Sequence, residues 1–109
     1  METINATSTY NYSSSRYGFN HTGILYLNGE EVQRATIHYT NRTWECYCGQ
    51  TARKSACADW LKEYEDATKD EVKARLGVSR ATKKVKDIVA TELANDAKYN
   101  AVKAHYESL

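Results

Sequence analysis

The sequence predicts an α+β fold, in which a three- to four-stranded antiparallel sheet is followed by two or three helices in a single domain over residues 1–109. The first observation is a change of apolar period within residues 23–64, from the period of two typical of strands to about 3.6, typical of a helix. The second is Asn28-Gly29 between two apolar runs, because both residues tolerate the positive φ of a hairpin turn. The third is a series of helix start and stop signals later in the chain.

Residues 1–22 form a lead rich in Thr, Ser, Asn and Tyr. Tyr10 and Tyr12 are spaced as alternate residues of a strand, so this lead is a candidate for a further strand. The same polar composition is also typical of a disordered arm, and the sequence leaves both interpretations open.

The sheet is predicted over residues 23–48. Its strands are Ile24 to Leu27, Val32 to Tyr39 and Trp44 to Cys48. Asn41-Arg42 is expected to close the second hairpin. Ala35, Ile37 and Tyr39 then lie on one apolar face of the sheet. Their cross-strand partners on that same face are Cys48, Cys46 and Trp44.

The register of the first hairpin depends on its loop. A two-residue loop pairs Ile24 with Gln33 and turns Leu25 and Leu27 away from the apolar face, whereas a three-residue loop ending in a bulge brings both leucines onto it. We expect the bulge, because burial of each leucine is worth about 1.5 to 3 kcal/mol.

A helix is predicted over residues 51–66, with Thr51 as its N-cap. Its apolar stripe comprises Cys57, Trp60, Leu61 and Tyr64. Trp60 and Trp44 are expected to anchor the core between sheet and helix.

A helical hairpin is predicted over residues 69–107. Thr68 and Glu71 have the spacing of a capping box, so a new helix is expected to start at Lys69 and to end before Gly77. Ser79 is the expected N-cap of a long helix from Arg80 to about Glu107. Polar residues dilute its apolar stripe, so its last turns are expected to project, fray or dock on a partner.

The three cysteines Cys46, Cys48 and Cys57 are an odd number, which argues against a disulfide framework. Residues two apart on a strand are separated by about 7 Å, which is poorly suited to shared tetrahedral zinc. The sequence therefore predicts buried thiols, no metal and no cofactor.

The charge pattern excludes a strong global attraction to polyanions, because 15 basic and 14 acidic residues leave a formal charge of +1. No apolar run is long enough to span a membrane, and the N-terminus lacks the pattern of an export signal. We expect an intracellular protein without a membrane partner.

Residues 71–89 resemble the helix-turn-helix of lac-type bacterial repressors. Val72, Leu76, Gly77, Val78, Ser79 and Thr82 match that pattern. Lys73 and Lys83 stand where the pattern has buried residues, so two capped helices and a turn are the simpler interpretation. Five of its residues form a basic segment and are candidates for phosphate contact: Arg75, Arg80, Lys83, Lys84 and Lys86.

Three antiparallel strands followed by a helix also resemble AP2-type and transposon-integrase DNA-binding modules. That resemblance implies base contacts from the polar face of the sheet, with Arg34, Thr36, His38, Glu45 and Tyr47 as the readers. Residues 49–61 resemble the last helix of double-stranded-RNA-binding domains, without the first helix of those domains. A small DNA-binding or regulatory module is therefore the alternative function.

Evidence for an enzyme is confined to His38 opposite Glu45. No nucleophile stands beside this pair and no phosphate-binding glycine loop is present, so the sequence predicts a protein that is not an enzyme.

Residues 23–64, with the string YTNRTWE before a Gln-led helix, are similar to small proteins of Gram-positive phages and mobile elements. Small tyrosine-rich proteins of this type include anti-defence proteins such as anti-CRISPR inhibitors. The resemblance implies a non-enzymatic inhibitor in the host cytoplasm that blocks a host defence protein or ribonucleoprotein complex by protein–protein contact. The chain is not acidic, which disfavours direct DNA mimicry.

Tyrosine and arginine are the side chains that most often anchor interfaces, which guides the choice of candidate contact residues. These are Tyr10, Tyr12, Tyr17, Arg34, Thr36, His38 and Tyr47. A homodimer through the C-terminal helix and direct contact with nucleic acid are left open by the sequence.

Overall fold

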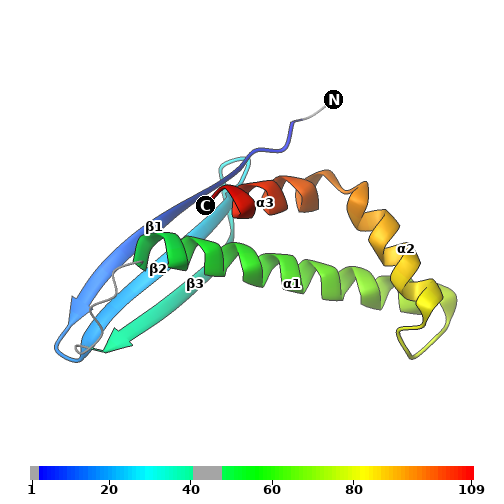
Figure 1. Ribbon diagram of the computed structural model, residues 1–109, viewed down its shortest axis with the longest axis horizontal. Helices are drawn as coiled ribbons and strands as arrows, with labels where there is room; N and C mark the ends of the chain where they lie inside the picture. Colours follow the sequence, from blue (N-terminus) through cyan, green and yellow to red (C-terminus); the bar gives the residue numbers. More distant parts are fainter. Residues whose placement is uncertain (1–2, 41–47) are drawn as a thin grey trace.

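The computed structural model describes residues 3–40 and 48–109. Three strands, β1 (Ala6–Ser15), β2 (Gly18–Leu27) and β3 (Glu30–Thr40), precede three helices, α1 (Cys48–Leu76), α2 (Lys83–Ala94) and α3 (Ala97–Ser108). The strands form one antiparallel sheet in the order β1-β2-β3 (Figure 1). The predicted α+β fold is thus confirmed.

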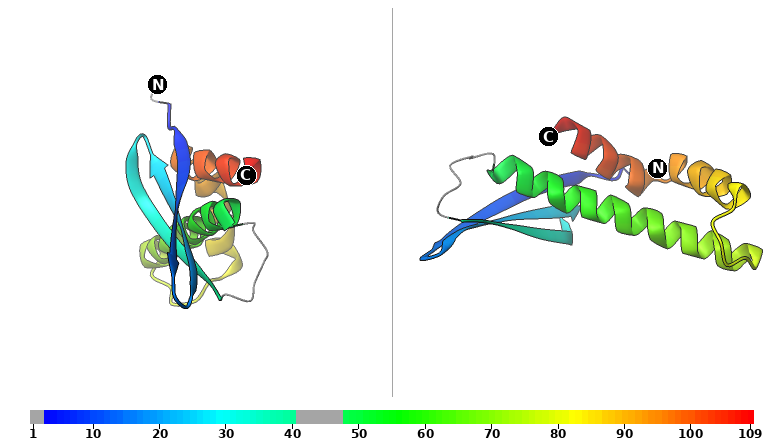
Figure 2. Two further views of the ribbon diagram at one scale, coloured as in Figure 1. Left: turned by 90° about the vertical axis from the view of Figure 1, so that its left-hand side faces the viewer. Right: turned by 60° about the horizontal axis from the view of Figure 1, so that its bottom comes forward.

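The helices lie on one side of the sheet (Figure 2). The first half of α1 crosses the sheet, and its second half extends beyond it, where α2 packs against it; α3 then returns toward β1 (Figure 1). The molecule is therefore elongated, with extents of 52 × 35 × 19 Å.

The N-terminal lead is a strand, as the spacing of Tyr10 and Tyr12 indicated. In β1, Tyr10 is paired with Gly23 and Tyr12 with His21. The strand predicted over Trp44 to Cys48 is wrong at Cys48, which is the first residue of α1, while residues 44–47 lie outside the described part of the chain.

The first hairpin combines features of both predicted loops. Asn28 and Gly29 form a two-residue turn with φ of 51° and 84°, and Leu27 pairs with Glu30. Tyr26 pairs with Glu31, and a bulge after this pair lets Leu25 pair with Gln33. This is the register expected from leucine burial. Both leucines are buried. The bulge is confirmed, but it lies within the strand rather than in the loop.

Helix α1 does not break at Thr68, so the predicted start of a new helix at Lys69 is wrong. The Thr68 hydroxyl donates a 2.9 Å hydrogen bond to the Tyr64 carbonyl instead of capping a helix. Thr51 is likewise inside α1 and not its N-cap. Because no glycine or proline occurs from residue 50 to residue 76, nothing in the backbone opposes a continuous helix.

Gly77 ends α1 as predicted. Its φ is +67°, its N–H donates to Ala74 at 3.2 Å, and the Val78 N–H donates to Lys73 at 3.0 Å. This pair of bonds is the Schellman arrangement, which satisfies carbonyls at the end of a helix.

The predicted long helix from Arg80 to Glu107 is two helices. Thr82, not Ser79, caps α2 through a 3.3 Å bond from the Val85 N–H. The chain then leaves the helical path at Asn95, and the Asp96 carboxylate caps α3 by accepting from the Tyr99 N–H at 3.0 Å. Asn and Asp favour such positions because their side chains compete for backbone hydrogen bonds.

The break turns α3 back onto the body of the protein, so the expectation that the last turns project or fray is wrong. Val102 is fully buried, and Tyr99 and Tyr106 pack against the core. The apolar residues of α3, which were candidates for a homodimer contact, therefore pack against the core of their own chain.

Two tyrosine–carboxylate bonds fasten α3 to α1. The Tyr64 hydroxyl donates to Asp96, and the Tyr99 hydroxyl donates to Glu65. These bonds are the main reason why the pKa of each tyrosine is raised to about 12.

The core consists of two clusters that α1 connects. The first lies between sheet, α1 and α3 and contains Leu25, Leu27, Ala35, Ala56, Cys57, Trp60 and Val102. The second lies between α1 and α2 and contains Val72, Val85, Val89 and Leu93. Tyr64 and Tyr99 pack against both.

The predicted core roles of Cys57 and Trp60 are confirmed. Cys57 is fully buried, and burial raises the pKa of its thiol to about 11, so the thiol stays protonated at neutral pH. Trp60 is buried and stacks on Tyr64. Trp44 and Cys46 lie outside the described residues.

No helix in residues 3–40 and 48–109 combines the length and the apolar character needed to cross a membrane.

Candidate functional site

Three exposed tyrosines lie on the β1–β2 hairpin, between the middle of β1 and the turn. Tyr10 and Tyr12 lie two residues apart on β1, so their side chains share one face of the sheet, and Tyr17 belongs to the turn. Their exposed fractions are 46%, 53% and 76%. We call these three residues the tyrosine surface.

Neighbouring rings hold two of these tyrosines in place. The Tyr12 ring stacks on Phe19, with centroids 5.8 Å apart, and is tilted against His21 at 5.0 Å. The Tyr10 ring stacks on His21 at 6.3 Å. Because His21 is buried, it provides a fixed platform beneath partly exposed rings.

Arg34, Thr36 and His38 lie together on the opposite face of the sheet, as the strand alternation predicted. The face toward α1 carries Ala35, which is buried in the first core cluster. Thr36 shares a 2.9 Å hydrogen bond with Thr22, His38 shares a 2.7 Å bond with Asn20, and Arg34 pairs with Glu31 at 2.6 Å. The structure therefore separates these residues from the tyrosine surface.

The open face of the sheet has little capacity for phosphate contact. Arg34 is its basic residue, and its Nε and Nη2 both donate to Glu31. Tyr47 and Glu45, the other predicted readers of bases, lie outside the described residues.

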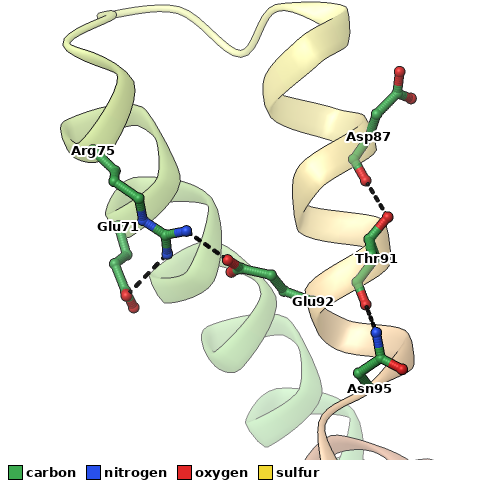
Figure 3. A network of polar contacts seen from close by, with 6 residues as sticks. All are labelled: Glu71, Arg75, Asp87, Thr91, Glu92 and Asn95. Atoms are coloured by element: carbon green, nitrogen blue, oxygen red, sulfur yellow. Dashed lines mark hydrogen bonds and ion pairs between the residues drawn. The ribbon is translucent and has the colours of Figure 1, made fainter.

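The basic segment divides into two parts. Arg75 connects α1 with α2, because its Nη1 donates to Glu92 at 2.7 Å and its Nη2 to Glu71 at 3.2 Å (Figure 3). Arg80, Lys83, Lys84 and Lys86 are exposed and make no ion pair with any residue that the structure describes. We call these four residues the basic tip.

A groove of about 250 Å³ runs between α1 and α2 next to the basic tip. Lys86 lines it opposite Glu65 and Asp66. Lys86 therefore stands at the margin of the basic tip, whereas Lys83 and Lys84 lie on the outer side of α2.

A polar cluster that the sequence did not reveal joins three elements. The Arg53 Nε on α1 donates to the Ser8 Oγ on β1 at 2.8 Å, and the Ser8 Oγ lies 2.7 Å from the Nε2 of His105 on α3. Since the oxygen of Ser8 already accepts from Arg53, its hydroxyl proton is available to donate to a neutral His105. No local pattern signals this cluster, because Ser8 and His105 are 97 residues apart.

The cluster contains a serine and a histidine, as nucleophilic catalysis requires, but its surroundings favour a structural role. A catalytic serine needs a free oxygen and a base oriented by a third group. Here Arg53 binds the oxygen, and no described carboxylate contacts His105.

We expect the His105 contact to weaken in acid. Burial, with a smaller contribution from the Arg53 charge, lowers the pKa of His105 below 6.5, so the folded state favours the neutral ring. The stability that this contact provides is complete above about pH 6.5 and is lost as the pH falls through the lowered pKa. Urea denaturation at pH 7.5 and pH 5 measures the loss.

The matched control is His105→Gln, which can still accept from Ser8 but does not titrate. The loss of stability between the two pH values is expected to be smaller in this variant. Equal losses in the two proteins would contradict the assignment to His105.

Comparison of the chain with protein-family models, with curated proteins and with solved structures found no match.

Proposed function

We propose that the protein is a non-enzymatic binding protein of phage or mobile-element type. It inhibits a host defence complex in the host cytoplasm by protein–protein contact through the tyrosine surface. The single observation that carries this proposal is that Tyr10, Tyr12 and Tyr17 are each about half exposed or more and gather on one hairpin.

The tyrosine surface has the properties of an interface anchor. Tyrosine buries a large amphipathic area with few rotatable bonds, and it is enriched among residues that dominate binding energy. The stacking of Tyr10 and Tyr12 on His21 and Phe19 reduces the entropy that these rings lose on binding.

The type of target is supported by the resemblance of residues 23–64 to phage and mobile-element proteins. The alternative of a DNA-binding module on the sheet is weakened by the pairing of Arg34 with Glu31. The basic tip is a separate surface, on the connection between α1 and α2 and the first turn of α2.

The test uses host strains that each carry one defined defence system, challenged with phage in the presence of the expressed protein. We expect plaque formation to recover by at least tenfold against one system. The variant Tyr10→Ser/Tyr12→Ser/Tyr17→Ser is expected to lose that recovery, because each anchor lost from an interface costs about 2 kcal/mol.

Val32→Ser is the matched control, because Val32 is also an exposed apolar residue but lies near the other end of the sheet. It is expected to keep full activity. If no defence system is relieved, the inhibitor proposal is wrong; if the folded triple variant inhibits like the parent, the tyrosine surface is not the contact.

A further inference from the structure

The basic tip lies at the far end of the molecule from the tyrosine surface. The connection between α1 and α2 and the turn of the β1–β2 hairpin stand at opposite ends of the longest axis, along which the molecule extends 52 Å (Figure 1). A partner at one end therefore leaves the other end available.

Positive charge exceeds negative charge at the tip. Residues 72–86 contain no Asp or Glu. Of the nearby carboxylates, Glu71 already pairs with Arg75. Asp87 lies on the side of α2 away from α1 (Figure 3), within one helical turn of Lys83 and Lys84, and Glu65 and Asp66 line the groove with Lys86. These carboxylates offset the positive charge of the tip only in part.

This arrangement opposes the stability of α2. The N-terminus of a helix is the positive end of its dipole, where acidic residues stabilise and basic residues destabilise. The first turn of α2 contains Lys83, Lys84 and Lys86 and no acidic residue. The cations thus repel one another and the helix end, a cost that an anionic partner would remove.

The backbone at the same place adds hydrogen-bond donors. Thr82 occupies the N–H groups of Val85 and Lys86 with its hydroxyl and its carbonyl. The N–H groups of Lys83 and Lys84 precede them at the start of the helix, where no helical carbonyl can accept. They point in the direction in which an anion would approach.

We propose that the basic tip binds the phosphate backbone of duplex nucleic acid, as a second contact in addition to the protein contact of the tyrosine surface. A duplex is favoured over a single strand because only a few cations are present, and a duplex, with its higher charge density, releases more counterions for each of them. An anionic membrane is disfavoured because Val78 is the only exposed large apolar residue of the connection.

The proposal predicts weak, sequence-independent binding that depends strongly on salt. Fluorescence anisotropy of a labelled 20-base-pair DNA duplex measures the affinity from 25 to 200 mM salt. Lys83→Glu/Lys84→Glu is expected to weaken binding by at least tenfold at the lowest salt and to reduce the slope of log K against log salt by about two.

This variant carries its own control for folding. Glutamate at the first positions of a helix is favourable, so the melting temperature is expected to stay the same or rise while DNA binding falls. Lys98→Glu/Lys103→Glu on α3 makes the same change of net charge at exposed positions away from the tip and is expected to affect binding much less. Tyr10→Ser/Tyr12→Ser/Tyr17→Ser is expected to bind DNA like the parent.

Several outcomes would overturn the proposal. These are no binding to the duplex at low salt, equal losses in the two charge-reversal variants, or preferential binding to a single-stranded RNA of the same length or to phosphatidylserine vesicles.

Discussion

Replacing Gly23 with alanine is expected to destabilise the protein by about 3 kcal/mol or more. A Cβ at this position would lie 2.0 Å from the carbonyl oxygen of Ala52, 2.3 Å from its carbonyl carbon and 2.6 Å from the Arg53 nitrogen. These are backbone atoms of α1 and cannot rotate away as a side chain could. Relief of the clash requires α1 to move off β2, which opens the first core cluster.

Gly29→Ala is the matched control. Gly29 has a φ of +84°, and a Cβ there would meet no atom within 4 Å. Its loss of stability is expected to be about 1 to 2 kcal/mol, from the left-handed conformation alone. Urea denaturation measures both variants, and a cost for Gly23→Ala no larger than that for Gly29→Ala would contradict the close approach of helix and strand.

Trp60→Ala is expected to cost about 3 to 5 kcal/mol. Trp60 is only 9% exposed, and its ring stacks on Tyr64 with centroids 4.6 Å apart. Its removal leaves a cavity between the sheet and α1 at the point where the two core clusters approach each other.

Tyr17→Ala removes an aromatic side chain that the structure leaves exposed and is expected to change stability by less than about 0.5 kcal/mol. Denaturant midpoints measured by far-UV circular dichroism compare the two variants directly. Similar midpoints for Trp60→Ala and the parent protein would place Trp60 outside the core.

The hairpin turn at Asn28-Gly29 and the end of α1 were predictable because their signals are local and act in the same direction as the packing. Asn28-Gly29 adopts the positive φ angles that its composition allows, and Gly77 does the same at the end of α1. The bulge was predictable for a different reason, since only that register buries both Leu25 and Leu27.

The helix boundaries show where local signals fail. Thr68 has a capping signal, yet a continuous helix keeps Val72 and Leu76 on the same stripe as Tyr64, so the packing favours a hydrogen bond within the helix. Asp96 has a weaker signal and does cap a helix, because the break allows Val102 to be buried against the sheet. Burial in the tertiary structure decides which of these two capping signals is used. That burial cannot be predicted from the four residues that make up each signal.

The candidate contact residues were partly predictable. Alternation along one strand places Arg34, Thr36 and His38 on one face, but it does not reveal that Thr36 and His38 find partners on β2. The basic segment was visible as a run of cations, whereas the role of Arg75 depends on Glu92, which is brought near only by the packing of α2 on α1.

The two core clusters differ in how much chain must be closed to form them. Val72, Val85, Val89 and Leu93 are close in sequence, so the loop that brings them together is short. The first cluster, by contrast, joins strands near one end of the chain to Val102 near the other. Because closing long loops costs more entropy and slows folding, the contact of α2 with the second half of α1 can form early, whereas the first cluster is completed only when α3 docks. We therefore expect transient opening to begin with α3, before α2 leaves α1.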